Sequence, residues 1–191
     1  MAPSYVDPDQ PLVAAAKAGD EAAAAQLWRA LNPPLLRYLR GRIGAGADDV
    51  AAAAWLDAAR GLPSFDGNDA DFRRWLFTIA RRRLIDEIRR RARRREQITA
   101  WAPERPDPAA AVDVDELGAA LALVRLLPGD QADAVLLRVV ADMDVAQVAA
   151  IMGKREGAVR VLVHRGLRRL QSLLEEQRVT QVDPTAMYRE Q

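Results

Sequence analysis

A stretch of 25 residues, from position 71 to position 95, constrains the fold more than any other part of the chain, because it lacks both glycine and proline. Its apolar residues recur at helical spacing on two faces. One face carries Phe72, Trp75, Leu76 and Ile79, and the other carries Phe77, Leu84 and Ile88. A helix with two apolar faces is typical of the central helix of a small bundle. Packing in a bundle does not explain the eleven arginines that the same stretch contains.

The remainder of the chain also favours helix. Alanine, leucine and arginine dominate, and no segment alternates with the period of two that a half-buried strand requires. We therefore expect an all-α protein. The expected helices of the first part of the chain cover residues 12–18, 21–31, 35–43, 50–60 and 71–95. A second helical unit is expected to begin near Asp115 and to be interrupted by Pro128, with helices following at 130–141, 145–152 and 156–176. We expect Asn32-Pro33-Pro34 to break the chain, and Asp48 or Asp49 to cap the helix that follows them.

The net charge of +1 conceals an uneven distribution along the chain. Residues 72–95 carry eleven bases and two acids, and residues 154–170 carry six bases and one acid. Between the two basic blocks, residues 96–116 carry six acids, one base and three prolines, a composition typical of a flexible linker. This pattern predicts contacts with a polyanion at two places. The expected organisation is a flexible N-terminus at 1–11, small helical domains at 12–95 and 117–176, a flexible acidic linker at 96–116 and a tail at 177–191.

Several classes of protein are disfavoured. The chain has no cysteine and one histidine, which excludes disulfides and makes a thiolate metal site impossible. It has no glycine-rich phosphate loop, so we expect no catalysis, no cofactor and no metal. Its N-terminus lacks the pattern of a signal peptide, and no apolar run reaches about 18 residues. We expect a cytoplasmic protein with no membrane span.

The second basic block has the pattern of a DNA-reading helix-turn-helix. Val159, Leu162, Val163, Gly166, Leu167 and Leu170 form one apolar stripe, while Arg160, Val161, His164 and Arg168 point away from it. Upstream, Asp144 and Gln147 have the spacing of a capping box, and Gly153 ends a short helix. A short helix, a glycine-containing turn and a longer basic helix suit the DNA major groove. A solvated basic helix in a bundle is the alternative interpretation.

The first basic block allows two interpretations as well. Its aromatic residues suit a bundle core, but arginines beside partly exposed rings also suit single-stranded nucleic acid, whose bases stack on the rings. The turn-rich segment at residues 64–70 precedes the helix and could receive an extruded base. A domain for single strands joined to a domain for duplex suits a protein that recognises a duplex and holds it open.

Four segments in order resemble bacterial RNA polymerase sigma factors of the extracytoplasmic-function (ECF) group, over about residues 12–174. They are KAGDEAAAAQLWRALNPPLLRYLRGRIG, ADDVAAAAWLDAARGLPSFDG, FRRWLFTIARRRLIDEIRRRARR and LLPGDQADAVLLRVVADMDVAQVAAIMGKREGAVRVLVHRGLRRLQ. The resemblance implies a subunit of core RNA polymerase. Its first domain would bind the largest-subunit clamp and the minus-ten element. Its second would bind the second-largest-subunit flap and the minus-thirty-five element of promoter DNA. The resemblance also implies inhibition by an anti-sigma factor.

The resemblance further implies three sets of site residues. The polymerase-binding set is Asp48, Asp49, Trp55 and Leu56. The minus-ten set is Phe65, Asp66, Gly67, Asn68, Arg73, Arg74, Trp75, Arg81, Arg82 and Asp86. The minus-thirty-five set is Lys154, Arg155, Arg160, Val161, His164 and Arg165.

The chain departs from the family pattern at a few of these places. Ala52 and Ala53 stand where the family usually has Gln and Glu, Arg82 where it often has Asn, and Arg155 where it usually has a small capping residue. Val161 replaces a common polar residue, which favours apolar contact to a thymine methyl. A free-standing helix-turn-helix regulator is the competing function, but such a protein would not need the arginine-rich helix of the first domain.

Overall fold

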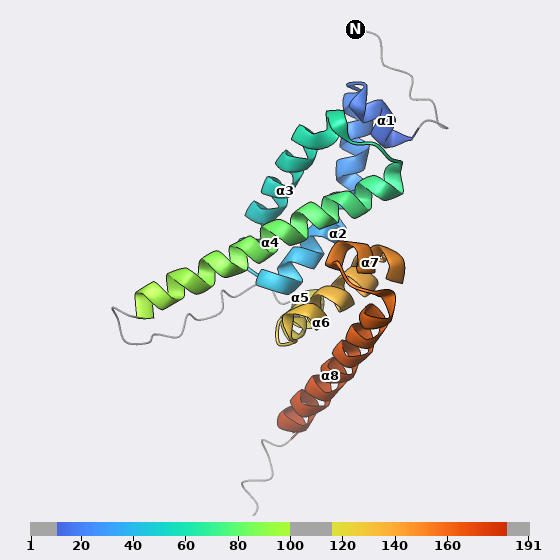
Figure 1. The fold of residues 1–191 in the computed structure, drawn as a ribbon. Helices are drawn as coiled ribbons and strands as arrows, with labels where there is room; N and C mark the ends of the chain where they lie inside the picture. Colours follow the sequence, from blue (N-terminus) through green and yellow to red (C-terminus); the bar gives the residue numbers. More distant parts are fainter. Residues whose placement is uncertain (1–10, 100–115, 183–191) are drawn as a thin grey trace, which may run out of the picture.

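The computed structural model describes residues 11–99 and 116–182, and these residues form helices and turns without a strand (Figure 1). The all-α expectation is confirmed for this part of the chain. The helical elements are α1 (Leu12–Lys17), α2 (Glu21–Ile43), α3 (Ala47–Gly61), η1 (Leu62–Ser64), α4 (Asp69–Thr99), α5 (Glu116–Val124), α6 (Gly129–Val135), η2 (Leu136–Val140), α7 (Val145–Met152) and α8 (Glu156–Val182). Most of the predicted acidic linker lies outside the described residues.

The N-terminal unit is a bundle in which α4 packs against α2 and α3, and α1 packs against α2. Its core contains Tyr38, Leu76, Phe77 and Leu84, all with no exposed surface. The carboxylate of Asp69, at the start of α4, accepts hydrogen bonds from the backbone N–H groups of Leu12 and Val13 at 3.1 and 2.9 Å. The first turn of one helix is therefore held by the first residue of another.

The predicted break at Asn32-Pro33-Pro34 is wrong, because α2 continues through both prolines to Ile43. Each proline forfeits a helical hydrogen bond, which normally interrupts a helix. Here Leu27, Leu31 and Leu35 follow the same face of α2 and are buried on both sides of the prolines. Burial of this face holds the helix together, and tertiary packing overrides the local preference.

The predicted cap of α3 is also wrong. The helix begins at Ala47, its N-cap is Gly46 with φ +82°, and Asp48 and Asp49 lie in its first turn. Their negative charges favour that position because the N-terminus of a helix carries partial positive charge. Glycine adopts the left-handed conformation at Gly46 without the steric cost that a side chain would add.

The C-terminal unit consists of α5, α6, η2, α7 and α8. Pro128 precedes α6, as expected, but the helix predicted at residues 130–141 changes at Leu136 into the π-helical segment η2. The capping box of α7 is confirmed: the Asp144 side chain accepts from the Gln147 N–H at 2.7 Å, and the Gln147 side chain accepts from the Asp144 N–H at 3.0 Å. Gly153 ends α7 in the left-handed conformation, with φ +62°. The helix-turn-helix of α7 and α8 is therefore present as predicted.

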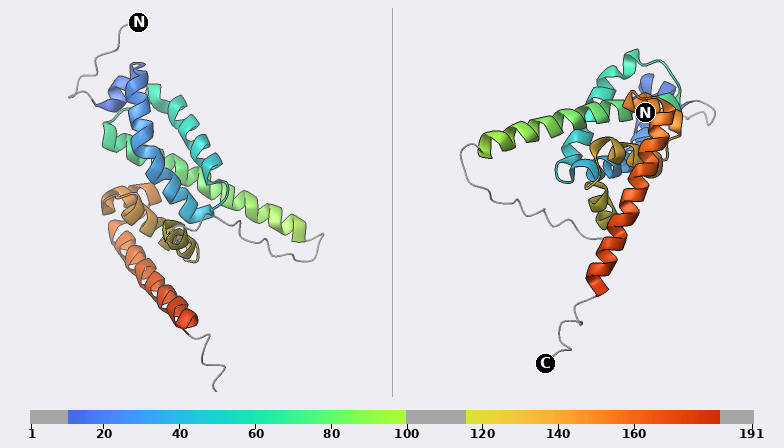
Figure 2. Two further views of the ribbon diagram at one scale, coloured as in Figure 1. Left: turned by 180° about the vertical axis from the view of Figure 1, so that it is seen from behind. Right: turned by 60° about the horizontal axis from the view of Figure 1, so that its bottom comes forward.

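The two units pack against each other, and their buried residues form one continuous core. The helices α5, α6 and η2 contact α2, and α7 contacts α4. Gly41 of α2 favours this approach, since a Cβ atom there would lie 2.7 Å from a methyl carbon of Leu136 and would force that side chain to move. The C-terminal half of α4 and the C-terminal part of α8 project away from the packed region (Figure 2). No helix within the described ranges is both long and apolar enough to cross a membrane.

Candidate nucleic-acid interface

An aromatic cluster joins the loop before α4 to the first turns of that helix. The rings of Phe65 and Trp75 lie 4.9 Å apart between centroids, and Phe72 contacts both. Phe72 is buried, whereas Phe65 and Trp75 are half-buried. Gly61 permits this packing, because a Cβ atom there would lie 2.7 Å from the Trp75 ring. The structure therefore brings together two aromatic residues of the predicted minus-ten set, one from the loop and one from the helix.

The loop itself is held in place by polar contacts. The Asn68 N–H donates to the Asp71 carboxylate at 3.2 Å, and the Asp71 N–H donates to the Asn68 side chain at 3.0 Å. The Lys17 ammonium group donates to the carbonyl of Phe65 at 2.7 Å. Asp66, Gly67 and Asn68 remain exposed. These contacts fix the ends of the loop while its tip stays exposed to solvent.

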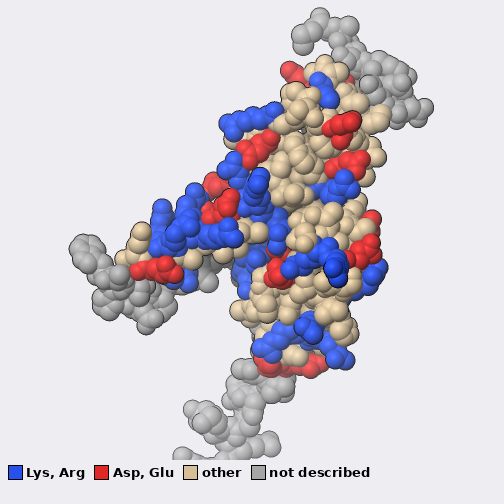
Figure 3. Space-filling model, viewed as in Figure 1, with Lys and Arg blue, Asp and Glu red and all other residues tan. Residues whose placement is uncertain are grey.

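The basic residues of α4 have two different environments. Arg74 and Arg82 are exposed, and Arg74 pairs with Asp71 at 2.9 Å. Arg73 and Arg81 instead face the C-terminal unit: Arg73 donates to the backbone carbonyl of Ala141, and Arg81 pairs with Asp133 at 2.9 Å. Asp86 is exposed, and arginine side chains gather along the projecting half of α4 (Figure 3). The predicted minus-ten set is therefore divided between a free surface and an internal contact.

The outward face of α8 agrees with the predicted duplex-reading surface. Val159 and Gly166 are buried and Leu162, Val163 and Leu170 are half-buried, although Leu167 of the predicted stripe is exposed. The opposite face exposes Arg155, Arg160, Val161, His164 and Arg165. Arg160 pairs with Glu156 at 2.7 Å, and Lys154 pairs with Asp130 at 2.9 Å. Such exposed pairs are weak, so the cations remain available to a polyanion.

The predicted polymerase-binding residues lie on α3 and fall into two groups. Asp48 and Asp49 are exposed, and Asp48 pairs with Arg40 at 3.0 Å. Trp55 and Leu56 line an apolar groove of about 500 Å³ between α2 and α3. Trp55 is partly buried, and its ring N–H donates to the Asn32 side chain at 3.0 Å, whereas Leu56 is 56% exposed.

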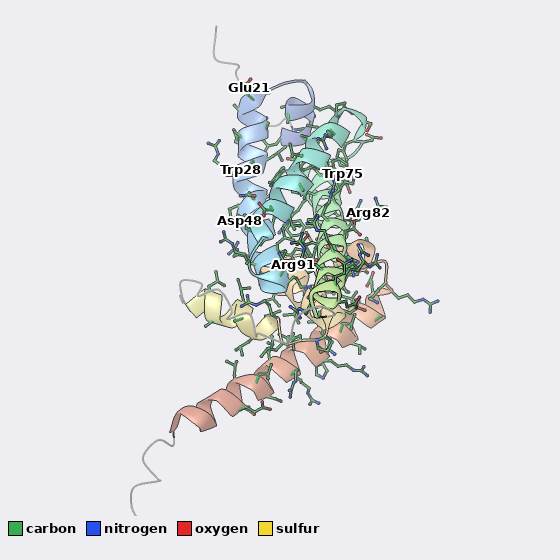
Figure 4. The ribbon with its side chains drawn as sticks, turned by 90° about the vertical axis from the view of Figure 1, so that its left-hand side faces the viewer. Glu21, Trp28, Asp48, Trp75, Arg82 and Arg91 are labelled. Atoms are coloured by element: carbon green, nitrogen blue, oxygen red, sulfur yellow. The ribbon has the colours of Figure 1, made fainter. Side chains whose placement is uncertain are left out.

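Sequence reasoning missed Trp28, which lines the same groove and is 51% exposed. The available signal was an aromatic residue placed beside the apolar stripe of α2, next to Leu27. Figure 4 shows Trp28 on the opposite side of the molecule from Arg82, so the apolar groove and the basic surface face different directions.

Asp133 was missed as well, although it is the only charged side chain that is buried among the described residues, with 2% of its surface exposed. Its carboxylate accepts from the Arg42 Nε at 2.5 Å, from the Arg81 Nε at 2.9 Å and from the Tyr38 hydroxyl at 3.2 Å. The signal was an aspartate in the otherwise apolar run around Ala132 and Ala134. A buried carboxylate in such a run requires cationic or hydrogen-bonding partners from elsewhere.

Burial, and secondarily the negative charge of Asp133, raises the pKa of the Tyr38 hydroxyl well above its ordinary value. The hydroxyl therefore keeps its proton under physiological conditions and remains a donor to the carboxylate. On the surface of α4, a hydrogen bond from Arg91 lowers the pKa of Glu87, which keeps this acid charged among the arginines.

The chain matches two family models, and each coincides with one structural unit. The model described as Sigma-70 region 2 matches residues 27–94, and that described as Sigma-70, region 4 matches residues 117–170. The fold and these matches define the class, which is the two-domain sigma factors. A free-standing regulator is not favoured, because the region 2 match covers most of the first unit.

Curated relatives narrow the class. The chain is 33% identical to the ECF RNA polymerase sigma factor SigD of Mycobacterium tuberculosis over an alignment of 170 residues that covers 83% of this chain and 80% of the relative. It is also 33% identical to the ECF RNA polymerase sigma factor BldN of Streptomyces coelicolor, over 86% of this chain and 65% of that protein. The chain belongs to the ECF RNA polymerase sigma factors.

Solved structures agree with this fold. The sigma factor RpoE in complex with the anti-sigma factor NepR from Bartonella quintana is 25% identical and superposes with a TM-score of 0.65, covering 80% of this chain and 96% of that one. CnrH in complex with the cytosolic domain of CnrY is also 25% identical, with a TM-score of 0.64, and covers 86% and 96% of the two chains.

Proposed function

We propose that this sigma factor divides promoter recognition between its two units. The N-terminal unit binds the largest-subunit clamp of core RNA polymerase through the groove between α2 and α3. It takes the minus-ten element on the Phe65–Trp75 cluster and the exposed arginines of α4. The C-terminal unit binds the second-largest-subunit flap and reads the minus-thirty-five element with α8. The protein acts in the cytoplasm and has no catalytic step of its own.

The exposed face of α8 is the observation that carries this proposal. Arg160, Val161, His164 and Arg165 are exposed on one side of the helix, while Val159 and Gly166 are buried on the other. The α7 capping box and the Gly153 turn hold the preceding helix at the start of α8. A helix that is anchored on one face and basic on the other fits the major groove, where arginine pairs with guanine.

We further propose an anti-sigma factor as a partner. One solved relative of this fold, the sigma factor RpoE from Bartonella quintana, was co-crystallised with the anti-sigma factor NepR. The apolar groove with exposed Trp28 and Leu56 supplies a surface that a helix of such a partner can cover.

Run-off transcription tests the proposal. Purified protein and core RNA polymerase are given a library of genomic promoter fragments, and the transcripts are sequenced. We expect new start sites that share two upstream elements at fixed spacing. Binding to duplex DNA without binding to core polymerase would contradict the assignment. The matched control is core polymerase alone, which defines the background start sites.

A further inference from the structure

The short helix α1 is attached at both ends to the loop before α4. At its start, the backbone N–H groups of Leu12 and Val13 donate to the carboxylate of Asp69, at 3.1 and 2.9 Å. At its end, the Lys17 ammonium group donates to the carbonyl of Phe65 at 2.7 Å. Phe65 and Asp69 enclose the exposed tip of the loop, residues 66–68, and α1 lies beside the start of α4 (Figure 1). The helix therefore spans the loop from one side to the other.

The two ends of the loop are held differently. At the end nearer α4, the backbone N–H groups of Asn68 and Asp71 each donate to the side chain of the other residue, at 3.2 and 3.0 Å. At the end nearer η1, the Phe65 N–H donates to the carbonyl of Leu62 at 3.1 Å. Among residues 11–99 and 116–182, Lys17 supplies the one hydrogen bond that the Phe65 carbonyl accepts. Loss of this ammonium group would free the peptide group at which the tip begins.

The tip is packed closely, so a small shift of the backbone would alter it. Gly67 has φ +151°, and a Cβ atom there would lie 2.8 Å from the Cβ atom of Asp71 and 3.0 Å from Cζ of the Phe65 ring. The Phe65 ring lies 4.9 Å from the ring of Trp75 between centroids. Rotation of the Phe65 peptide group would therefore move both the tip and a ring of the aromatic cluster. Groups that bind a ligand specifically must be held within about 0.5 Å of the productive geometry.

The contact of Lys17 adds little to the stability of the fold. Its side chain is exposed, whereas Val13 and Ala15 of the same helix are buried and anchor α1 on the core. An exposed hydrogen bond exchanges with hydrogen bonds to water and so contributes little net free energy. A charged donor nevertheless makes a shorter and more directional bond than a neutral donor. Removal of the ammonium group should leave the fold intact and loosen the loop.

We propose that Lys17 is a positioning residue for base capture. Its ammonium group fixes the Phe65 carbonyl, and this holds the loop tip and the Phe65 ring in the arrangement that accepts an unstacked base. The inference rests on the proposed function, because it assumes that the cluster of Phe65 and Trp75 takes a base of the minus-ten element. Direct contact of the ammonium group with a DNA phosphate is the competing role, which the salt dependence of binding distinguishes.

Four variants separate the hydrogen bond from the charge. Lys17→Met keeps the aliphatic stem and removes the donor and the charge, and Lys17→Gln repeats the loss with a shorter, uncharged polar side chain. Lys17→Arg keeps both donor and charge, so it should restore the wild-type behaviour. Arg29→Met is the matched control, because Arg29 is exposed on α2 and makes no hydrogen bond to any described residue of the loop. Circular dichroism verifies that each variant is folded.

The experiment measures the capture of single bases by the holoenzyme with core RNA polymerase. The run-off start sites give the minus-ten sequence, which a fork-junction DNA carries as a single strand. Fluorescence anisotropy measures affinity for the intact DNA and for DNAs with one abasic site at each position in turn. We expect an abasic site at the captured position to weaken wild-type binding about tenfold, because the stacked base is lost. In Lys17→Met and Lys17→Gln this penalty should fall to about threefold or less, and in Lys17→Arg it should stay about tenfold.

Three results would overturn the inference. An unchanged abasic penalty in Lys17→Met and Lys17→Gln would mean that Lys17 does not position the loop. An equal loss of affinity on intact and abasic DNA, with a salt slope smaller by about 0.7, would assign Lys17 to a phosphate contact. The same fall of the penalty in Arg29→Met would attribute the effect to overall charge.

Failure of the proposed function gives a different result. A wild-type holoenzyme that produces no new start sites would contradict the assignment as a sigma factor. One that initiates but shows no abasic penalty at any position would contradict base capture by the aromatic cluster, and the inference about Lys17 would fall with it. Both results are seen in the wild-type protein, before any variant is compared.

Discussion

At the scale of single residues, a side chain proposed to bind DNA often makes a structural contact as well. Trp75 packs on Phe65 and over Gly61, yet it remains half-buried. Arg160 pairs with Glu156 on the free protein, yet both side chains are largely exposed. In each case the structural contact is weak or incomplete, which leaves the group available for nucleic acid.

Replacement of Trp75 by alanine should impair promoter opening more than formation of the closed complex, because the proposed function stacks an unpaired base on the lost ring. Permanganate reactivity of melted thymines measures opening, and gel mobility measures the closed complex. Trp75→Phe is the control, since it keeps an aromatic ring on Phe65. Circular dichroism verifies that the variant is folded, and normal opening by folded Trp75→Ala would contradict the role.

Replacement of Arg160 by alanine should cost about 1–3 kcal/mol at the upstream promoter element, because one contact to a base edge is lost. The pair with Glu156 opposes this loss little, since exposed pairs contribute about 1 kcal/mol or less. Binding is measured by fluorescence anisotropy on the promoter duplex and on random duplex. Arg169→Ala, farther along the same helix, is the control. An equal loss on random duplex would reassign Arg160 to phosphate contact.

At the scale of elements, α2 and α3 show how helices expose as well as bury apolar surface. The face of α2 that contains Leu27 and Leu31 enters the core. The neighbouring Trp28 and Leu56 remain exposed and line the apolar groove. An exposed apolar groove on a protein that belongs to a large assembly is best explained by a partner helix.

Replacement of Leu56 by alanine should weaken binding to core RNA polymerase about tenfold, which corresponds to about 1.5 kcal/mol for an exposed leucine that becomes buried on binding. Stability should change little, because Leu56 is exposed in the free protein. Competition binding with labelled protein measures the affinity. Leu174→Ala removes a similarly exposed leucine on α8 and serves as the control. Equal effects of the two substitutions would argue against the groove.

At the scale of the whole molecule, the two units share one core although they match separate family models. Leu136 fits over Gly41, and the carboxylate of Asp133 bridges α2 and α4. The N-terminal and C-terminal helical units are therefore packed directly against each other.

A shared core predicts cooperative unfolding of the free protein. Trp28, Trp55 and Trp75 lie in the N-terminal unit, so in a Trp101→Phe background tryptophan fluorescence reports on that unit, whereas circular dichroism follows helices in both units. We expect coincident transitions by both methods in urea. Gly41→Val, which disrupts the contact with Leu136, should separate them. Distinct transitions in the wild-type protein would contradict a single cooperative unit.

The sequence by itself determined the features that depend on residues close together along the chain. The Asp144–Gln147 capping box, the Gly153 turn and the buried stripe of α8 depend on residues a few positions apart, so their patterns predicted them. The candidate residues of α4 were placed on a helix for the same reason. Leu167 was the one misplaced member of the stripe, because only packing against real neighbours decides which edge of a stripe is covered.

Tertiary structure alone decided the features that depend on residues far apart in the sequence. The helix α2 passes through Pro33 and Pro34 because its buried face holds it, although the local preference is to break. Asp133 meets Arg81 and Arg42 across 52 and 91 residues of sequence, and no local pattern specifies such a meeting. The contact depends on the complementary shapes of the two packed surfaces, including the absence of a side chain at Gly41, where Leu136 packs. Docking of the units therefore determined which arginines of the basic helix are free and which are engaged.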